Sequence, residues 1–105
     1  CKGCCRWTKT YAHFCRPAAV GPDGWSQVSL TALAELGGRS LQVRFRNDTL
    51  PFLQMWRCQR GEADVISIEP VSHRIAKRPE LAAAGELVPL QPGEALTYAI
   101  AFAVV

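Results

Sequence analysis

The alternation of apolar and polar residues predicts strands in the middle of the chain. Residues 40–46 (SLQVRFR) alternate apolar and polar positions, which is typical of a strand with one buried face. A turn over 47–51 leads to residues 52–58 (FLQMWRC), which are apolar on both faces and therefore predict a central strand. Residues 58–64 contain a glycine and predict a second turn, and 64–69 (DVISIE) predict a third strand. The short spacing favours antiparallel pairing of the second strand with the third.

The C-terminal part of the chain predicts a long connection and two further strands. Prolines limit helix in residues 70–85, although 79–85 allow one helical turn that ends at Gly85. Residues 86–90 predict a short edge strand because they contain a proline. A turn over 91–94 then precedes 95–105, the clearest strand, whose large residues on one face and small residues on the other predict packing on both sides.

Two segments before these strands are less specific. Residues 28–36 (VSLTALAEL) fit either a strand or a helix, and two glycines end them. Residues 21–24 (GPDG) are a turn signal.

These elements predict a mostly β protein, an antiparallel β-sandwich. About six short strands hardly complete two layers, so we expect the C-terminal fragment of a larger sandwich. A last strand with unpaired backbone groups along its edge also allows self-association through strand edges.

Composition narrows the class of protein. The chain has 105 residues, of which 49% are apolar and 20% charged, which predicts one globular domain. A net charge of +3 is too small to argue for nucleic acid, and no apolar run is long enough for a membrane span. Because the first thirty residues hold no apolar signal-peptide region, we expect a cytoplasmic protein. The chain begins at Cys1 and its only methionine is Met55, which suggests a fragment, a processed chain or an imperfect gene prediction.

Residues 1–22 differ from the rest and predict a poorly ordered leader before a domain at 23–105. The leader holds four of the five cysteines and four basic residues without an acid, with interleaved aromatics. Its pattern C-x2-C-C-x9-C admits a four-thiolate zinc site or free thiols, and the lack of a second C-x2-C pair favours free thiols. Basic residues beside aromatics also fit single-stranded nucleic acid, but the charge is weak for that role. We therefore expect neither a metal nor a nucleic-acid partner.

Three residues are candidates for chemistry near the third predicted strand. Glu69 ends that strand, and Pro70 restricts it to extended backbone, so it is either a solvated strand end or a positioned general base. His73 follows in a loop and is either a proton-transfer partner or a surface imidazole. Trp56 lies on the neighbouring strand and either fills the core or stacks on the apolar face of a sugar.

Four segments, in order, resemble the C-terminal end of the aldose 1-epimerase (galactose mutarotase-like) family. They are GPDGW (21–25), LPFLQMWR (50–57), DVISIEPVSH (64–73) and LVPLQPGEALTYAIAF (87–102). The resemblance covers roughly residues 21–105 and implies part of a large antiparallel β-sandwich that binds an aldose in its concave face.

The resemblance also implies a reaction and assigns its base. In that family the matching glutamate removes the proton of the anomeric hydroxyl, which assigns the general base to Glu69. A histidine protonates the ring oxygen, the ring opens, and reclosure gives the other anomer without a metal or cofactor. The resemblance and the residues together suggest Trp56 and His73 as substrate-binding residues.

The chain departs from the family upstream of Glu69. The family's acid histidine and its substrate-holding residues lie in a part that this chain does not match, and His13 is not in their context. A frameshifted or truncated gene is one hypothesis for this difference, and we expect weak activity or none from the chain alone. The alternative function is a carbohydrate-binding β-sandwich module without turnover.

Overall fold

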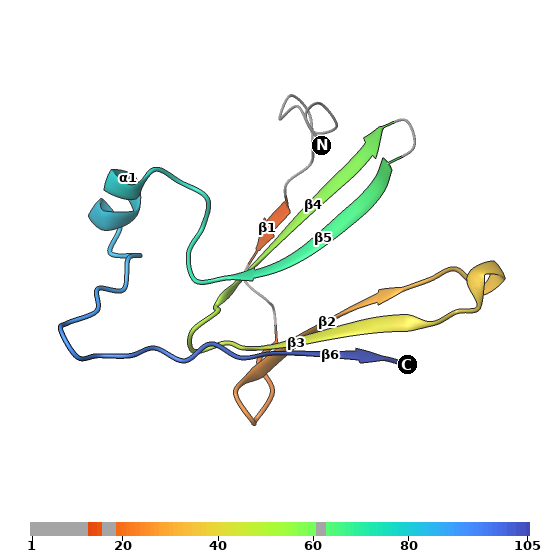
Figure 1. Ribbon diagram of the computed structural model, residues 1–105, viewed down its shortest axis with the longest axis horizontal. Helices are drawn as coiled ribbons and strands as arrows, with labels where there is room; N and C mark the ends of the chain where they lie inside the picture. The colour runs from red at the N-terminus through yellow and green to blue at the C-terminus, as the bar shows by residue number, and fades with distance from the viewer. Residues whose placement is uncertain (1–12, 16–18, 61–62) are drawn as a thin grey trace.

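Two antiparallel sheets make up the computed structural model, which describes residues 13–15, 19–60 and 63–105 (Figure 1). One sheet has the strand order β1-β4-β5, from β1 (His13–Cys15), β4 (Phe52–Arg60) and β5 (Ala63–Val71). The other has the order β2-β3-β6, from β2 (Trp25–Thr31), β3 (Ser40–Arg46) and β6 (Ile100–Val104). A 3₁₀ turn, η1 (Ala34–Leu36), links β2 to β3, and a short helix, α1 (Arg78–Ala83), lies in the long connection from β5 to β6. The predicted class, mostly β with antiparallel neighbours, is confirmed.

The predicted strands in the middle of the chain are confirmed. β3 has the predicted bounds, because its alternating residues place Val43 and Phe45 in the core and Arg44 in solvent. β4 pairs antiparallel with β5, and it is the central strand of its sheet, since β1 pairs along its other edge. Both strands extend into the predicted turn over 58–64, whose residues 61–62 lie outside the described part of the chain.

The ambiguous segment and the two glycine turns each have a defined structure. Residues 28–36 are split, since β2 ends at Thr31 and η1 follows. In the turn over 21–24 the Gly24 N–H donates to the Gly21 carbonyl at 2.9 Å. In the turn over 91–94 the Glu94 N–H donates to the Gln91 carbonyl at 3.0 Å, and Gly93 has a φ of 86°, which a type II turn requires at its third position.

Two C-terminal predictions are wrong. Residues 86–90 are irregular and not an edge strand; Pro89 offers no backbone donor there. β6 covers only Ile100–Val104 of the strand predicted over 95–105, and it is not packed on both sides. Phe102 is 69% exposed, because β6 is the edge strand of its sheet and the described part of the chain places no layer over it.

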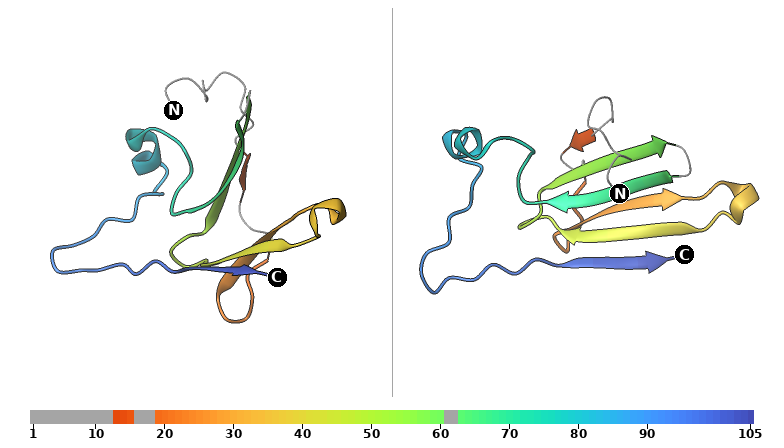
Figure 2. Two further views of the ribbon diagram at one scale, coloured as in Figure 1. Left: turned by 45° about the vertical axis from the view of Figure 1, so that its right-hand side comes forward. Right: turned by 45° about the horizontal axis from the view of Figure 1, so that its top comes forward.

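The core lies where the two sheets meet. Phe45, Leu50 and Leu53 are buried there, and side chains from both sheets pack against them. From the 47–51 turn the sheets diverge, so their facing surfaces separate toward the far ends (Figure 2). The accessible surface of 8164 Å² exceeds the roughly 5,800 Å² expected for a compact protein of this mass. The sandwich is therefore open, with a core at one corner.

The predicted boundary at residue 22 does not coincide with the start of the sheets. β1 lies inside the predicted leader and pairs with β4 in the register His13 with Met55. Residues 1–12 and 16–18, which include Cys1, Cys4 and Cys5, lie outside the described residues. The separation into a leader and a domain stays a prediction.

Candidate functional site

Glu69 lies on β5 directly opposite Gln54 of β4. The Gln54 amide Nε2 donates a hydrogen bond of 2.7 Å to Glu69 Oε2. Among the described residues, the other carboxylate oxygen, Oε1, accepts no hydrogen bond, and the side chain is half-buried. One oxygen is thus fixed by the protein while the other remains able to accept a proton. This geometry fits a positioned base, and it equally fits a partly solvated carboxylate near the end of a strand.

Gln54 is a site residue that the sequence reasoning missed. Its side chain is 9% exposed, in a strand whose neighbours Leu53 and Phe52 are also buried. A buried amide costs free energy unless it is hydrogen-bonded, so its bond to Glu69 satisfies both groups. The available signal was one polar residue between apolar ones in a predicted central strand.

Trp56 shares a face of the sheet with Glu69. Trp56 pairs with Ser67, two positions before Glu69 on β5, and directly opposed residues point to the same side of a sheet. Such diagonal neighbours have Cα atoms about 7–8 Å apart. The backbone N–H of Trp56 donates to Ser67 Oγ at 3.2 Å, and the Trp56 side chain is half-buried. The indole is therefore neither a fully buried core residue nor a freely exposed one.

His73 lies beyond the end of β5 and is exposed. Its Nδ1 is 2.9 Å from the carbonyl oxygen of Arg74, and because a carbonyl only accepts, Nδ1 carries the hydrogen. In the neutral ring Nε2 is then the nitrogen that can take up a proton. Among the described residues, His73 and Glu69 form no hydrogen bond with each other.

A cavity lies beside these residues; His73 lines it, whereas Glu69 and Trp56 do not. Its volume is about 460 Å³, and its lining residues are Leu50, Gln54, Pro70, Val71, Ser72, His73, Arg74, Ile75 and Ala76. Gln54, which holds Glu69, and Pro70, which follows it, thus line the same cavity as His73. This volume is in the usual range for a small-molecule site.

An ion pair joins Arg74, which lines this cavity, to Glu86. Arg74 Nε donates to both carboxylate oxygens of Glu86, at 2.8 Å and 3.0 Å. The hydrogen bond to Glu86 and the attraction of its charge hold the pKa of Arg74 above its usual value. The pair joins the segment that follows β5 to the segment that follows α1.

The described residues offer no metal site of three or more histidine, cysteine or acidic side chains. The same part of the chain has no helix that is long and apolar enough to cross a membrane. The site offers a carboxylate with one free oxygen, an indole on the same face of the sheet, and an imidazole in the lining of the neighbouring cavity.

Comparison with known proteins gives one match. The sequence model of a family described as a domain of unknown function (DUF4432) matches residues 10–104. No curated protein and no solved structure matches the chain. The matched range begins within the predicted leader and includes β1.

Proposed function

The chain belongs to the DUF4432 family, and we propose that it is an aldose 1-epimerase-like isomerase in which Glu69 is the general base. The observation that carries this proposal is the Gln54–Glu69 hydrogen bond of 2.7 Å. A general base must be held in reach of the proton that it removes, and a bond to one oxygen orients the other. The order of the four segments that resemble the aldose 1-epimerase family supports the same role.

The proposed reaction uses proton transfers at two oxygen atoms of the sugar. Glu69 Oε1 takes the proton of the anomeric hydroxyl, and an acid gives a proton to the ring oxygen as the bond from that oxygen to C1 breaks. Rotation about C1–C2 and reversal of both transfers close the ring as the other anomer. The resemblance puts the acid upstream of the part that this chain matches, so the acid is assigned to no residue here.

Trp56 and His73 are proposed to hold the sugar. A pyranose presents an apolar C–H face, and Trp56 offers an indole on the same face of the sheet as Glu69. The exposed Nε2 of His73 can hydrogen-bond to a sugar hydroxyl. The ring would then lie over the β4–β5 pair with its anomeric carbon at Glu69.

Polarimetry of freshly dissolved α-glucose or α-galactose tests the proposal. We expect the chain to accelerate mutarotation weakly, since its acid is unassigned, and Glu69→Gln to remove that acceleration, because general acid–base catalysis contributes about 10²–10⁴-fold. Glu80→Gln is the matched control, because Glu80 is exposed in the first turn of α1. Equal acceleration by the Glu69→Gln variant, or none by the unaltered chain, would contradict the proposal.

The second candidate function is carbohydrate binding without turnover. It is favoured by one observation: the hydrogen-bond partner of the Glu69 carboxylate among the described residues is the amide of Gln54, which cannot serve as the acid. In this case Glu69 only accepts a sugar hydroxyl, and Glu69→Gln leaves sugar affinity nearly unchanged. Calorimetric titration with galactose, beside the polarimetry, separates the two functions.

A further inference from the structure

Two further cavities adjoin the one near Gln54, and all three share His73. The first has a volume of about 240 Å³, and Ser72, Arg78 and Tyr98 in its lining carry hydrogen-bond donors in their side chains. The second, of about 380 Å³, is again lined by His73 and Arg78. Arg78 lines both of these cavities and Tyr98 lines the first, and neither residue lines the cavity beside Gln54 and Pro70.

The charges around these two cavities leave one cation without a partner. Glu86 is the carboxylate that lines the smaller cavity, and both of its oxygens already bind Arg74. Among the described residues, Arg78 makes no ion pair, although it lines both cavities. A guanidinium stays protonated at any ordinary pH and presents a planar set of donors that matches phosphate or carboxylate. The wall therefore has positive charge and several donors available to an anion.

We propose that Arg78, with the hydroxyl groups of Ser72 and Tyr98, binds the anionic group of the sugar substrate. The substrate class is then an aldose that carries a phosphate or a carboxylate at the end of the molecule opposite its anomeric carbon. The proposal requires such a molecule to reach from Glu69, past the cavity lined by Gln54 and His73, to Arg78. The identification of the ligand as a substrate rests on the proposed function, while the anion site stands on Arg78 and its neighbours.

Calorimetric titration of the chain with four probes tests this inference. The probes are glucose, glucose 6-phosphate, glucuronate and inorganic phosphate, so that the sugar, the phosphate and the carboxylate are compared separately. We expect one of the two anionic sugars to bind at least about tenfold more tightly than glucose, because charge-assisted hydrogen bonds are the strong ones. Whichever anionic sugar binds more tightly identifies the group.

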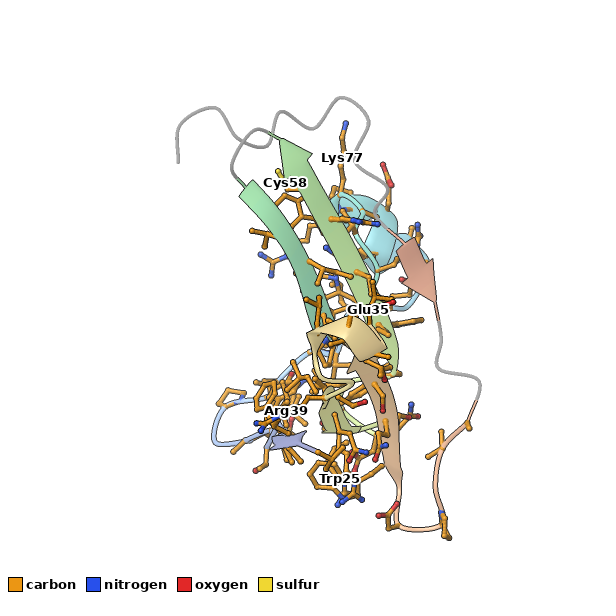
Figure 3. All side chains as sticks on the ribbon, turned by 90° about the vertical axis from the view of Figure 1, so that its right-hand side faces the viewer. Trp25, Glu35, Arg39, Cys58 and Lys77 are labelled. Carbon is orange, nitrogen blue, oxygen red and sulfur yellow. The ribbon has the colours of Figure 1, made fainter. Side chains whose placement is uncertain are left out.

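Arg78→Gln should remove the tenfold preference and leave glucose binding within about twofold, while Arg78→Lys keeps part of it. Arg39→Gln makes the same change at an exposed arginine near β3, far from α1 (Figure 3), and should change nothing. Lys77→Gln removes the neighbouring cation, which lines none of these cavities, and should also have little effect. Circular dichroism checks that each variant is folded.

The inference is overturned if neither anionic sugar binds more tightly than glucose, or if Arg78→Gln and Arg39→Gln have equal effects. Inorganic phosphate that binds as tightly as glucose 6-phosphate would overturn the assignment to a sugar. Failure of the proposed function can be told apart from failure of this inference. If only the proposed function fails, an anionic sugar still binds in a way that depends on Arg78, but polarimetry shows no acceleration of mutarotation.

Discussion

Gln54 donates a 2.7 Å hydrogen bond to Glu69 across the β4–β5 pair, from a side chain that is only 9% exposed to one that is half-buried. The register that brings them together also places Trp56 on the same face of the sheet. Because β4 is the central strand, Gln54 has little freedom to move. The carboxylate is thus held by a rigid element and not by a loop.

Replacement of Gln54 by leucine tests whether this hydrogen bond positions a base. We expect kcat for mutarotation to fall about 10-fold to 100-fold with little change in KM, because a poorly oriented base costs rate more than binding. Gln27→Leu, at an exposed glutamine of β2, is the control. A rise in KM with unchanged kcat would indicate that Gln54 serves binding only.

Replacement of Trp56 by alanine tests the sugar-stacking face. Loss of one aromatic contact is expected to cost about 1 kcal/mol, or roughly fivefold in sugar affinity by calorimetry. Trp25→Ala is the matched control, since Trp25 is also half-buried but belongs to the β2-β3-β6 sheet. Its ring centroid lies 5.2 Å from the guanidinium carbon of Arg44 in that same sheet. Equal losses in the two variants would argue against a role of Trp56 in stacking.

The strands that border the core could be predicted because each has one face with a defined environment. In β3 the alternation alone fixes Val43 and Phe45 inside. Gly85 and Gly93 mark a helix end and a turn for a local reason, since both have positive φ. In β6 the pattern did not predict the environment of the strand. Its large and small faces predicted two covering layers, but the pattern cannot tell whether those layers exist within the chain.

The site was predictable in part for a similar reason. Glu69 and Trp56 stood out because a carboxylate before a proline and an indole in an apolar strand are local features. The partner of Glu69 depends on strand register, which the sequence pattern did not specify to the residue. The sequence pattern did not single out Arg78, because its proposed role depends on the Arg74–Glu86 pair, which joins residues 12 positions apart and occupies the nearby carboxylate.

Two phenylalanines on neighbouring strands lie on the same face of the β2-β3-β6 sheet but differ in burial. Phe45 is 0% exposed and Phe102 is 69% exposed. We expect Phe45→Ala to lower the free energy of unfolding by about 3–5 kcal/mol and Phe102→Ala to change it by less than about 0.5 kcal/mol. Urea denaturation followed by circular dichroism measures both. A large loss for Phe102→Ala would show that another copy or segment covers β6 in solution.

The Arg46–Asp48 pair gives the fold a dependence on acid pH. Arg46 Nη2 donates to Asp48 Oδ2 at 2.6 Å and Nε donates to Oδ1 at 3.2 Å. This hydrogen bonding is the largest cause that lowers the pKa of Asp48 below its usual value of 3.8. Because the pKa is lower in the folded state, the stabilisation is present above 3.8 and is lost as the pH falls through the lowered pKa.

Asp48→Asn should therefore remove part of the difference in urea midpoint between about pH 7 and about pH 3. The effect is expected to be small, since the Arg46 and Asp48 side chains are 42% and 58% exposed. Glu35→Gln is the control, because it removes an exposed carboxylate that forms no ion pair among the described residues. If Asp48→Asn and Glu35→Gln changed the pH dependence equally, the ion pair would contribute nothing beyond the net charge.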